Sequence, residues 1–293
     1  MDIRPATETR AADGVLLVDK PGRMTSHDVV AVARRAMRVR RVGHAGTLDP
    51  AATGLLVLLV GRGTRLMPYI DAEPKVYHAT IRFGSETDTD DATGQVTRES
   101  APPALDAIHG AIARLTGVIE QVPPAYSAKK VGGARAYAQA RRGAPVGLSP
   151  TRVIVHAWDV LHHRHDSVDV RIVCSGGTYI RALARDLGRL TDSAAHLFAL
   201  RRISSGPFHV EDATTVDDLR SGRVVLLPLR AAIASMAAQT VDAAAAARVA
   251  HGNAIAAQVA GAHVALIDEG GDLIGVAERS GDDLHPRLVL RNA

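Results

Sequence analysis

The sequence predicts an α+β protein with a mixed, largely antiparallel sheet flanked by helices, followed by a small β-rich C-terminal domain. Residues 76–83 alternate in polarity with a period of two, as a half-buried strand does. Residues 26–37 and 180–190 repeat apolar side chains at helical spacing. Beyond residue 236 the chain turns alanine-rich and then gives short strand-like runs. We therefore expect one domain over residues 1–236 and a second over residues 237–293.

Length and composition support a folded protein of two domains. The chain has 293 residues, of which 46% are hydrophobic and 23% are charged, which is close to the average for globular proteins. The single cysteine, Cys174, excludes an internal disulfide and a multi-thiolate zinc or iron–sulfur site. No apolar run is long enough to cross a bilayer and the first residues are polar, so we expect a cytoplasmic protein without membrane contact.

The N-terminal elements are a strand and a helix. Residues 14–20 form an apolar run that ends at a turn, and Ser26 is the expected N-cap of the helix over 26–37. Five of the eight residues from 34 to 41 are arginine, and none is acidic. Such a run is either a solvated face or a set of contacts to phosphates, and the sequence leaves both readings open.

The later elements follow from the same periodicities. A helix is expected over 104–115, and two strands over 153–160 and 168–174 with a turn at 162–167. In the helix over 180–190, arginines stand at positions i, i+4 and i+8 opposite the apolar side, where they would contact phosphates: Arg181, Arg185 and Arg189. Strands of the second domain are expected over 262–267, 273–277 and 287–290.

Residues 43–56 are the most unusual segment. Three glycines and an Asp-Pro step exclude a regular helix or strand, so this is a shaped loop. Its one carboxylate, Asp49, either caps its own backbone or carries chemistry. No Gly-Lys-Ser/Thr follows, which excludes a phosphate-binding P-loop.

The loop, GHAGTLDPAATGLL, resembles the motif G-H-x-G-x-L-D-P-x-A-T-G-L/V-L of the TruB family of tRNA pseudouridine synthases. Other segments are similar to further motifs of that family: LVDKPGRMTS at 17–26, KVY at 75–77, TDTD at 87–90, PPAYSAKK at 123–130, CSGGTYIR at 174–181 and AHLFALRR at 195–202. The resemblance covers residues 14–230, and the C-terminal LHPRLVL at 284–290 is similar to a PUA domain.

The resemblance implies the pseudouridine synthase fold and the conversion of uridine 55 in the T-arm (TΨC loop) of tRNA to pseudouridine. The reaction breaks the N1–C1′ bond of a flipped uridine, turns the uracil and rejoins it through C5. The family's catalytic aspartate matches Asp49, for which attack on C1′, attack on C6 and formation of a glycal all remain open. Arg181 would pair with that carboxylate, and Tyr77 would stack on the base and take the C5 proton.

Further positions carry over as substrate contacts. His44 matches the histidine that fills the space left by the flipped nucleotide, and Tyr179 a second substrate contact. Leu200 would form an apolar wall of the pocket, and Lys20 would support the aspartate loop or the base of the pocket.

No cofactor and no metal are expected, because the isomerisation neither gains nor loses an atom. The histidines at 162, 163 and 165 are interpreted as a hairpin tip, and the aspartates at 88, 90 and 91 as a turn. The compact length favours direct recognition of tRNA by a monomer without a guide RNA.

Two other classes of function are alternatives to this reading: an RNA chaperone and a phosphotransferase. An RNA chaperone would fold the tRNA elbow without chemistry, and the presence of Asp49, Tyr77 and Arg181 together argues against it. A magnesium-dependent phosphotransferase would use Asp49 as an acyl-phosphate acceptor and would lose activity in EDTA.

Overall fold

The computed structural model describes residues 13–126, 130–131, 134–135 and 148–290. The N-terminal half contains β1 (Gly14–Lys20), α1 (Ser26–Met37), β2 (Val42–His44), β3 (Thr53–Val60), η1 (Gly61–Leu66), β4 (Lys75–Phe83), β5 (Ser85–Thr87), β6 (Val96–Glu99), α2 (Leu105–Arg114), β7 (Gly117–Gln121), β8 (Lys130–Val131) and β9 (Ala134–Arg135). The predicted helix over 104–115 is confirmed as α2.

The C-terminal half begins with two long strands. It contains β10 (Thr151–Arg164), β11 (Ser167–Cys174), α4 (Ile180–Leu190), β12 (Ala195–Ser205), β13 (Phe208–His209), η2 (Val210–Asp212), β14 (Thr214–Thr215), α5 (Val216–Arg220), η3 (Leu229–Ile233), β15 (Ala238–Val241), α6 (Ala243–Ala250), β16 (Ile255–Ala256), β17 (His263–Asp268), β18 (Leu273–Ser280) and β19 (Asp283–Val289).

A ten-stranded mixed sheet organises the larger part of the described chain. Its main path runs β14-β1-β3-β12-β4-β11-β10-β7, with β2 and β13 attached at the side. The pairs β1–β14 and β3–β12 are parallel, and the other pairs are antiparallel. This confirms the predicted α+β class and the largely antiparallel sheet.

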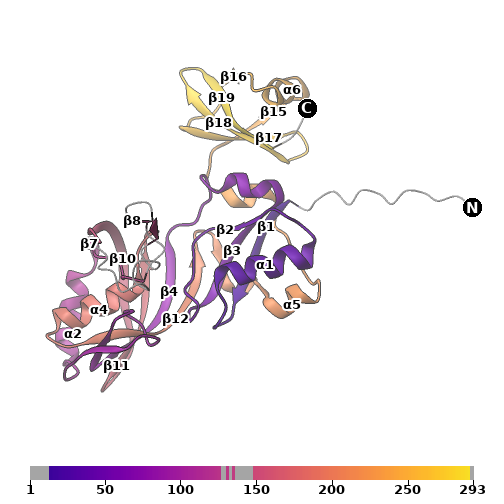
Figure 1. Ribbon diagram of the computed structural model, residues 1–293. Helices are drawn as coiled ribbons and strands as arrows, with labels where there is room; N and C mark the ends of the chain where they lie inside the picture. The colour runs from indigo at the N-terminus through magenta and orange to yellow at the C-terminus, as the bar shows by residue number, and fades with distance from the viewer. Residues whose placement is uncertain (1–12, 127–129, 132–133, 136–147, 291–293) are drawn as a thin grey trace, which may run out of the picture.

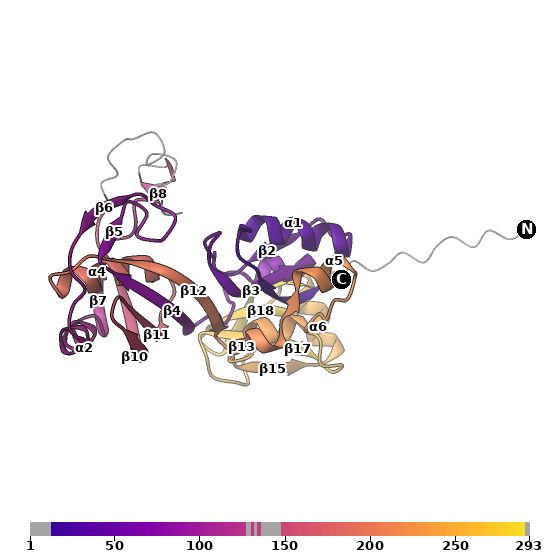
Figure 2. The ribbon, with the colours of Figure 1, turned by 90° about the horizontal axis from the view of Figure 1, so that it is seen from below.

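Strands β4 and β12 join the two halves of this sheet (Figures 1 and 2). On one half α1 packs over β1 and β3, and on the other α2 and α4 cover β4, β10 and β11. The crossing at β3–β12 is tight: Gly54 has φ +98°, and a Cβ there would lie 2.2 Å from the Arg202 carbonyl oxygen. Only glycine fits this position, because any side chain would push the two halves apart.

Helix α1 has the predicted extent but not the predicted cap. Thr25 is the N-cap: its hydroxyl accepts a hydrogen bond from the Asp28 amide at 3.0 Å, and the Asp28 carboxylate accepts one from the Thr25 amide at 2.8 Å. This capping box leaves the Ser26 hydroxyl free for another partner. The prediction of Ser26 as N-cap was therefore wrong by one residue.

Alternation in β4 is confirmed, since Tyr77, Ala79, Ile81 and Phe83 are all buried. The turn predicted over 162–167 is wrong, because β10 continues to Arg164. Residues 162–164 stay paired with 167–169 of β11, which leaves only residues 165 and 166 to turn the chain.

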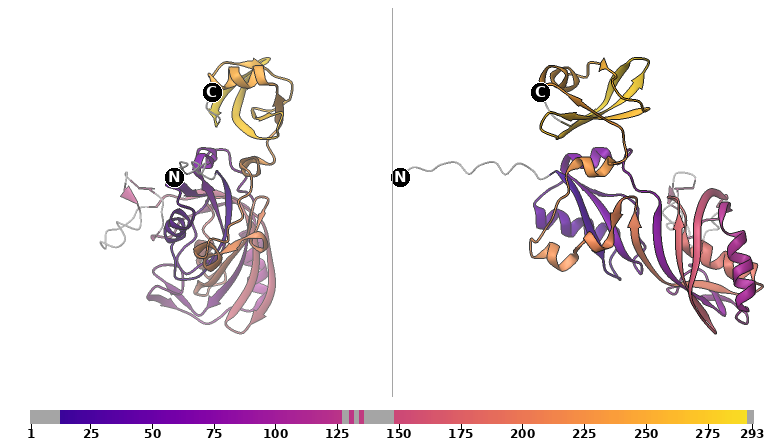
Figure 3. Two further views of the ribbon diagram at one scale, coloured as in Figure 1. Left: turned by 90° about the vertical axis from the view of Figure 1, so that its right-hand side faces the viewer. Right: turned by 180° about the vertical axis from the view of Figure 1, so that it is seen from behind.

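A separate five-stranded sheet, β15-β17-β18-β19-β16, follows residue 236 and lies above the larger sheet in Figure 1 and in both views of Figure 3. It packs one face against η1 and η3, where Arg62 and Arg65 donate to the carbonyls of Leu290 and Val289. The third predicted strand, over 287–290, is longer than expected and begins at Asp283. Among the described helices, none has the length and apolarity to span a membrane.

Candidate active site

The loop that carries Asp49 (residues 45–52, the aspartate loop) connects β2 to β3. Ser26 holds this loop by hydrogen bonds. The Ser26 hydroxyl accepts a hydrogen bond from the Leu48 amide at 2.9 Å and donates one to the Leu48 carbonyl at 3.1 Å. Both residues are buried. The backbone on the N-terminal side of Asp49 is therefore fixed to the first turn of α1.

Lys20, at the end of β1, holds the other side of the same loop. Its fully buried ammonium donates to the carbonyls of Pro21, Met24 and Pro50 at 2.9, 2.8 and 3.3 Å. Burial lowers the pKa of Lys20 to about 8, against the opposing effect of the Asp49 charge. Lys20 does not line the cavity described below, so its place is that of a support for the loop.

Asp49 and Arg181 form an ion pair at the wall of the cavity. Arg181 Nε lies 2.9 Å from Asp49 Oδ2, and Arg181 Nη2 donates to Asp49 Oδ1 at 3.2 Å. The Nε–H does not point at the carboxylate, so the contact is one hydrogen bond and one close ionic approach rather than a bidentate fork. The Asp49 side chain is 40% exposed, whereas that of Arg181 is only 6% exposed. The carboxylate thus faces the cavity with its cation behind it.

The guanidinium of Arg181 is itself anchored by backbone. Its Nη1 donates to the Thr89 carbonyl and its Nη2 to the Tyr126 carbonyl, each at 2.9 Å. Asp91 Oδ2 lies 3.7 Å from its Nε. Because these partners come from two separate segments, the guanidinium has little freedom to leave the carboxylate.

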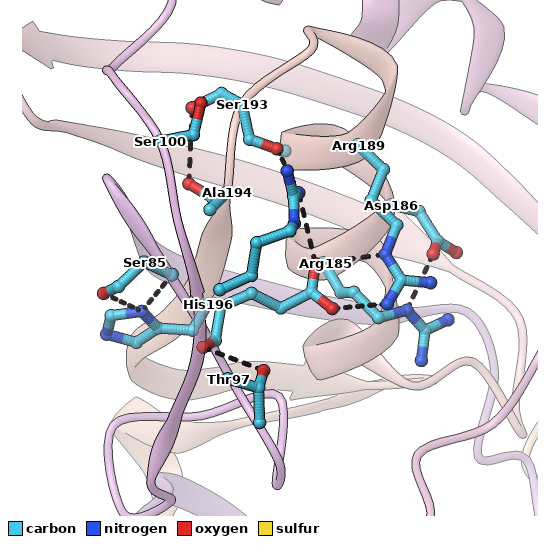
Figure 4. A network of polar contacts seen from close by, with 12 residues as sticks. Ser85, Thr97, Ser100, Arg185, Asp186, Arg189, Ser193, Ala194 and His196 are labelled. Atoms are coloured by element: carbon cyan, nitrogen blue, oxygen red, sulfur yellow. Dashed lines mark hydrogen bonds and ion pairs between the residues drawn. The ribbon is translucent and has the colours of Figure 1, made fainter.

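The prediction that Arg181, Arg185 and Arg189 contact phosphates is wrong for the first two, whose side chains are buried, whereas the Arg189 side chain is 54% exposed and ion-paired. Arg185 is buried against Asp90 and Asp186, with 2.9 Å to each carboxylate. Arg189 is bound by both oxygens of buried Glu86 (Figure 4). Acidic residues of the segment 86–91 fold over this side of α4 and neutralise it.

The cavity beside Asp49 has a volume of about 210 Å³. This is below the roughly 300–1,000 Å³ typical of sites for drug-sized ligands, so it suits a single planar base. Its lining brings together residues from four segments: Gly46, Thr47, Leu48, Asp49, Lys75, Tyr77, Ser175, Gly177, Thr178, Tyr179, Ile180, Arg181, Leu200 and Arg202. Of the expected site residues, Asp49, Tyr77, Tyr179, Arg181 and Leu200 therefore share one cavity.

Tyr77 lies on the cavity-facing side of β4 and is 6% exposed. Burial raises the pKa of Tyr77, and the nearby Arg202 guanidinium only partly offsets this. The residue is therefore a neutral phenol before substrate binds. Stacking needs no ionisation, whereas acceptance of a proton would require the phenolate, which the charge of Arg202 favours.

His44 does not line this cavity. Its ring lies edge-to-face with that of His27, with 5.3 Å between the ring centroids, and its buried Nδ1 has no hydrogen-bond partner among the described residues. Burial lowers the pKa of His44, with further lowering from His27 and Arg202. A neutral imidazole beside the loop is what these surroundings favour.

Three residues that shape the site were not among the expected site residues: Ser26, predicted only as a helix N-cap, Lys75 and Arg202. Arg202 is fully buried and donates to the carbonyls of Leu55 and Gly46 at 2.7 and 3.1 Å. The sequence signal for Arg202 was an arginine at a core position of a strand. A fully buried guanidinium is rare unless it has partners, so such a position indicates that other groups converge on it.

The aspartates at 88, 90 and 91 lie in a turn, as predicted. Asp91 accepts hydrogen bonds from Thr89 and Thr93, and Asp88 from the Gln95 amide. Across the described ranges, no group of three or more potential ligands could hold a metal ion. Residues 127–129 of the expected PPAYSAKK motif, like the polar first twelve residues, lie outside the described residues.

Comparison with known proteins identifies the family. Residues 34–180 match the TruB family pseudouridylate synthase N-terminal domain, and residues 181–233 match the tRNA pseudouridylate synthase B C-terminal domain. A tRNA pseudouridine synthase B of Thermobifida fusca is 46% identical over 95% of this chain and 99% of its own length. One from Mycobacterium tuberculosis is 42% identical over 96% of both chains.

Among solved structures, the Cbf5-Nop10-Gar1 complex contains a similar chain with a TM-score of 0.71 at 23% identity. That alignment covers 95% of this chain and 85% of the other, and it supports the fold alone. The fold is that of a pseudouridine synthase. Within that class, the chain belongs to the TruB family.

Proposed function

We propose that this protein is a tRNA pseudouridine synthase that converts uridine 55 in the T-arm of tRNA to pseudouridine. The target uridine is flipped out of the RNA loop into the cavity, where the glycosidic bond breaks and the base is reattached through C5. The relatives named tRNA pseudouridine synthase B, at 42–46% identity over nearly the whole chain, support tRNA as the substrate.

The observation that carries the proposal is the ion pair of Asp49 and Arg181. The carboxylate is 40% exposed and lines a base-sized cavity, while the cation that orients it is 6% exposed. An ionised, oriented and accessible carboxylate is what attack on C1′, attack on C6 and glycal formation all require. The proposal leaves these three routes open.

The other residues divide between the base and the loop. Tyr77 stacks on the uracil and, once ionised to the phenolate, takes the C5 proton. Tyr179 is a second contact and Leu200 is the apolar wall. Lys20 and Ser26 hold the aspartate loop. His44 lies outside the cavity beside the same loop, which suits a contact to the RNA that the flipped nucleotide has left.

The phosphates of the tRNA are contacted by the exposed arginines at the end of α1 and in the loop after it: Arg34, Arg35, Arg38, Arg40 and Arg41. Such contacts position the RNA while the cavity reads the base. Residues 237–293 are proposed as a PUA-like RNA-binding domain, supported by their own sheet and core. Direct recognition by a monomer in the cytoplasm, without a guide RNA, completes the proposal.

The test is mass-spectrometric mapping of an unmodified tRNA transcript after incubation with the purified protein. We expect one new pseudouridine, at position 55, with tritium released from 5-labelled uridine and no effect of EDTA. D49N should give no product while binding tRNA within about twofold of wild type. D159N is the matched control, because it removes the carboxylate of an exposed ion pair with Arg171.

The alternatives give different results. Binding without tritium release would identify an RNA chaperone, and loss of activity in EDTA would point to magnesium-dependent chemistry. Turnover by D49N at the wild-type rate would remove Asp49 from the mechanism.

A further inference from the structure

A third cation, Lys75, stands in the cavity beside the two arginines. It is the first residue of β4, two positions before Tyr77, so both side chains lie on the same face of the strand and line the cavity. Among the described residues, no hydrogen bond and no ion pair reaches Lys75 Nζ. The group is therefore available to a ligand.

The ammonium of Lys75 lies between two loops of the site. A Cβ built on Gly46 of the aspartate loop would lie 3.7 Å from Lys75 Nζ, and one built on Gly176, before α4, would lie 3.4 Å from it. A larger residue at either glycine would crowd the lysine. The absence of both side chains keeps the space around the ammonium open toward the cavity.

The two arginines of the cavity are already engaged. Arg181 is bound to Asp49 and to the Thr89 and Tyr126 carbonyls, and Arg202 donates to the carbonyls of Leu55 and Gly46. Their hydrogen bonds hold the loops and the carboxylate. Of these three cations, Lys75 is the one that makes no hydrogen bond within the described part of the chain.

We propose that Lys75 is a further catalytic residue, whose ammonium binds a carbonyl oxygen of the flipped uracil and stabilises the negative charge that develops on the ring. This inference rests on the proposed function. The site would then have two cations with separate roles: Lys75 would bind the base, and Arg181 is paired with Asp49.

The charge follows from the electron balance of the reaction. When the N1–C1′ bond breaks, its electron pair leaves with the base, so the uracil becomes an anion delocalised over N1, O2 and O4. The C5–C1′ bond then forms, C5 loses its proton and N1 gains one. Attack of Asp49 on C6 would also place negative charge on the ring, toward O4. A cation at a ring carbonyl therefore lowers the barrier by every route left open above.

Electrostatics in the cavity suit this role. Burial lowers the pKa of Lys75, and the Arg202 charge lowers it further, while Glu73 and Cys174 raise it. The other ionisable side chains that line the cavity are those of Asp49, Tyr77, Tyr179 and Arg181. A partly desolvated ammonium interacts more strongly with a developing anion than a hydrated one does.

The experiment measures single-turnover rates and tRNA affinity for K75M and K75R. We expect K75M to lower the rate constant by about 100-fold, the scale of losing one such donor, with the Kd for tRNA within about threefold of wild type. K75R, which keeps the charge, should recover at least tenfold of that loss. R171M is the matched control, because it removes an exposed cation from the neighbouring strand β11.

A pH profile separates catalysis from mere support of the loops. In the wild type, the rate should fall as the pH rises through the pKa of Lys75. In K75R that alkaline limb should move to higher pH, because the guanidinium stays charged.

Three results would overturn the inference: a K75M rate within threefold of wild type, a K75R rate no better than that of K75M, or loss of tRNA affinity as large as the loss of rate. Its failure is distinct from failure of the proposed function. Failure of the proposed function would show as an inactive wild type, whereas each of the three results above is measured against an active wild type.

Discussion

Asp49 and Arg181 stand 132 residues apart in the chain, yet Arg181 Nε lies 2.9 Å from Asp49 Oδ2. The arginine comes from the first turn of α4 and the aspartate from the loop before β3. The ten-stranded sheet brings them together, because β12 follows α4 and pairs with β3 at Thr53 and Gly54. The candidate site thus lies where the two halves of the sheet join.

Replacing Arg181 should impair both activity and stability. R181M leaves Asp49 without its cation and frees the Thr89 and Tyr126 carbonyls. We expect kcat to fall by at least 100-fold, and the free energy of unfolding to fall by about 1–3 kcal/mol, because the backbone partners of the buried guanidinium lose their donor. R181K should lie between, because a lysine keeps the charge but not the planar set of donors. Turnover assays and urea unfolding measure the two effects, and an R181M variant with more than a tenth of the wild-type kcat would contradict the prediction.

Ser26 and Thr25 offer neighbouring substitutions with different consequences. S26A removes both hydrogen bonds to Leu48 and leaves its buried amide and carbonyl unpaired. This should cost about 1–3 kcal/mol and lower kcat roughly tenfold, since a small misplacement of the next residue, Asp49, slows the reaction. Turnover assays and thermal unfolding check both values.

The control is T25A, which removes the N-cap of α1. It should cost about 1 kcal/mol and leave kcat unchanged. An equal loss of kcat in both variants would mean that Ser26 acts through helix stability alone.

Asp90 should make stability depend on pH. Burial raises its pKa from 3.8 to about 6, despite the charge of Arg185. The folded state then holds a proton that the unfolded chain has released between pH 4 and 6, so stability falls as the pH rises through this window. The full effect is roughly 3 kcal/mol at most, from about two pKa units.

Urea unfolding at several pH values from 4 to 7 measures this slope for wild type and for D90N. The amide does not titrate, so D90N should lack the contribution, although its absolute stability is lower because Arg185 loses its partner. Parallel slopes for the two proteins would rule out Asp90 as the group responsible.

The arginines after α1 should set the salt dependence of tRNA binding. In R40Q/R41Q, the slope of log Kd against log salt concentration should fall by between one and two, because about one counterion is released per phosphate contact. The single-turnover rate at saturating tRNA should not change. R164Q/R171Q is the control, since both arginines are exposed and paired with carboxylates. An unchanged slope in R40Q/R41Q would show that the run is only a solvated face.

Local sequence determined much of this protein. The period of two over 76–83 fixed which face of β4 is buried, and the apolar spacing over 26–37 and 180–190 located α1 and α4. The glycines and the Asp-Pro step marked the loop of Asp49. These features depend on dihedral preferences and on the side-chain direction of neighbouring residues, which a single segment encodes.

Tertiary structure alone decided what covers each face. The stripe of Arg185 and Arg189 opposite the apolar side of α4 gave no sign that Asp90 and Glu86 would form ion pairs with it. Nor did the sequence indicate that Ser26 would hydrogen-bond to Leu48 while Thr25 capped the helix, or that Lys75 would line the cavity together with Tyr77. The period of a helix or strand predicts which way each side chain points from the backbone. The charged groups that a side chain then meets come from segments remote in sequence, and only the folded sheet brings those segments within hydrogen-bonding distance.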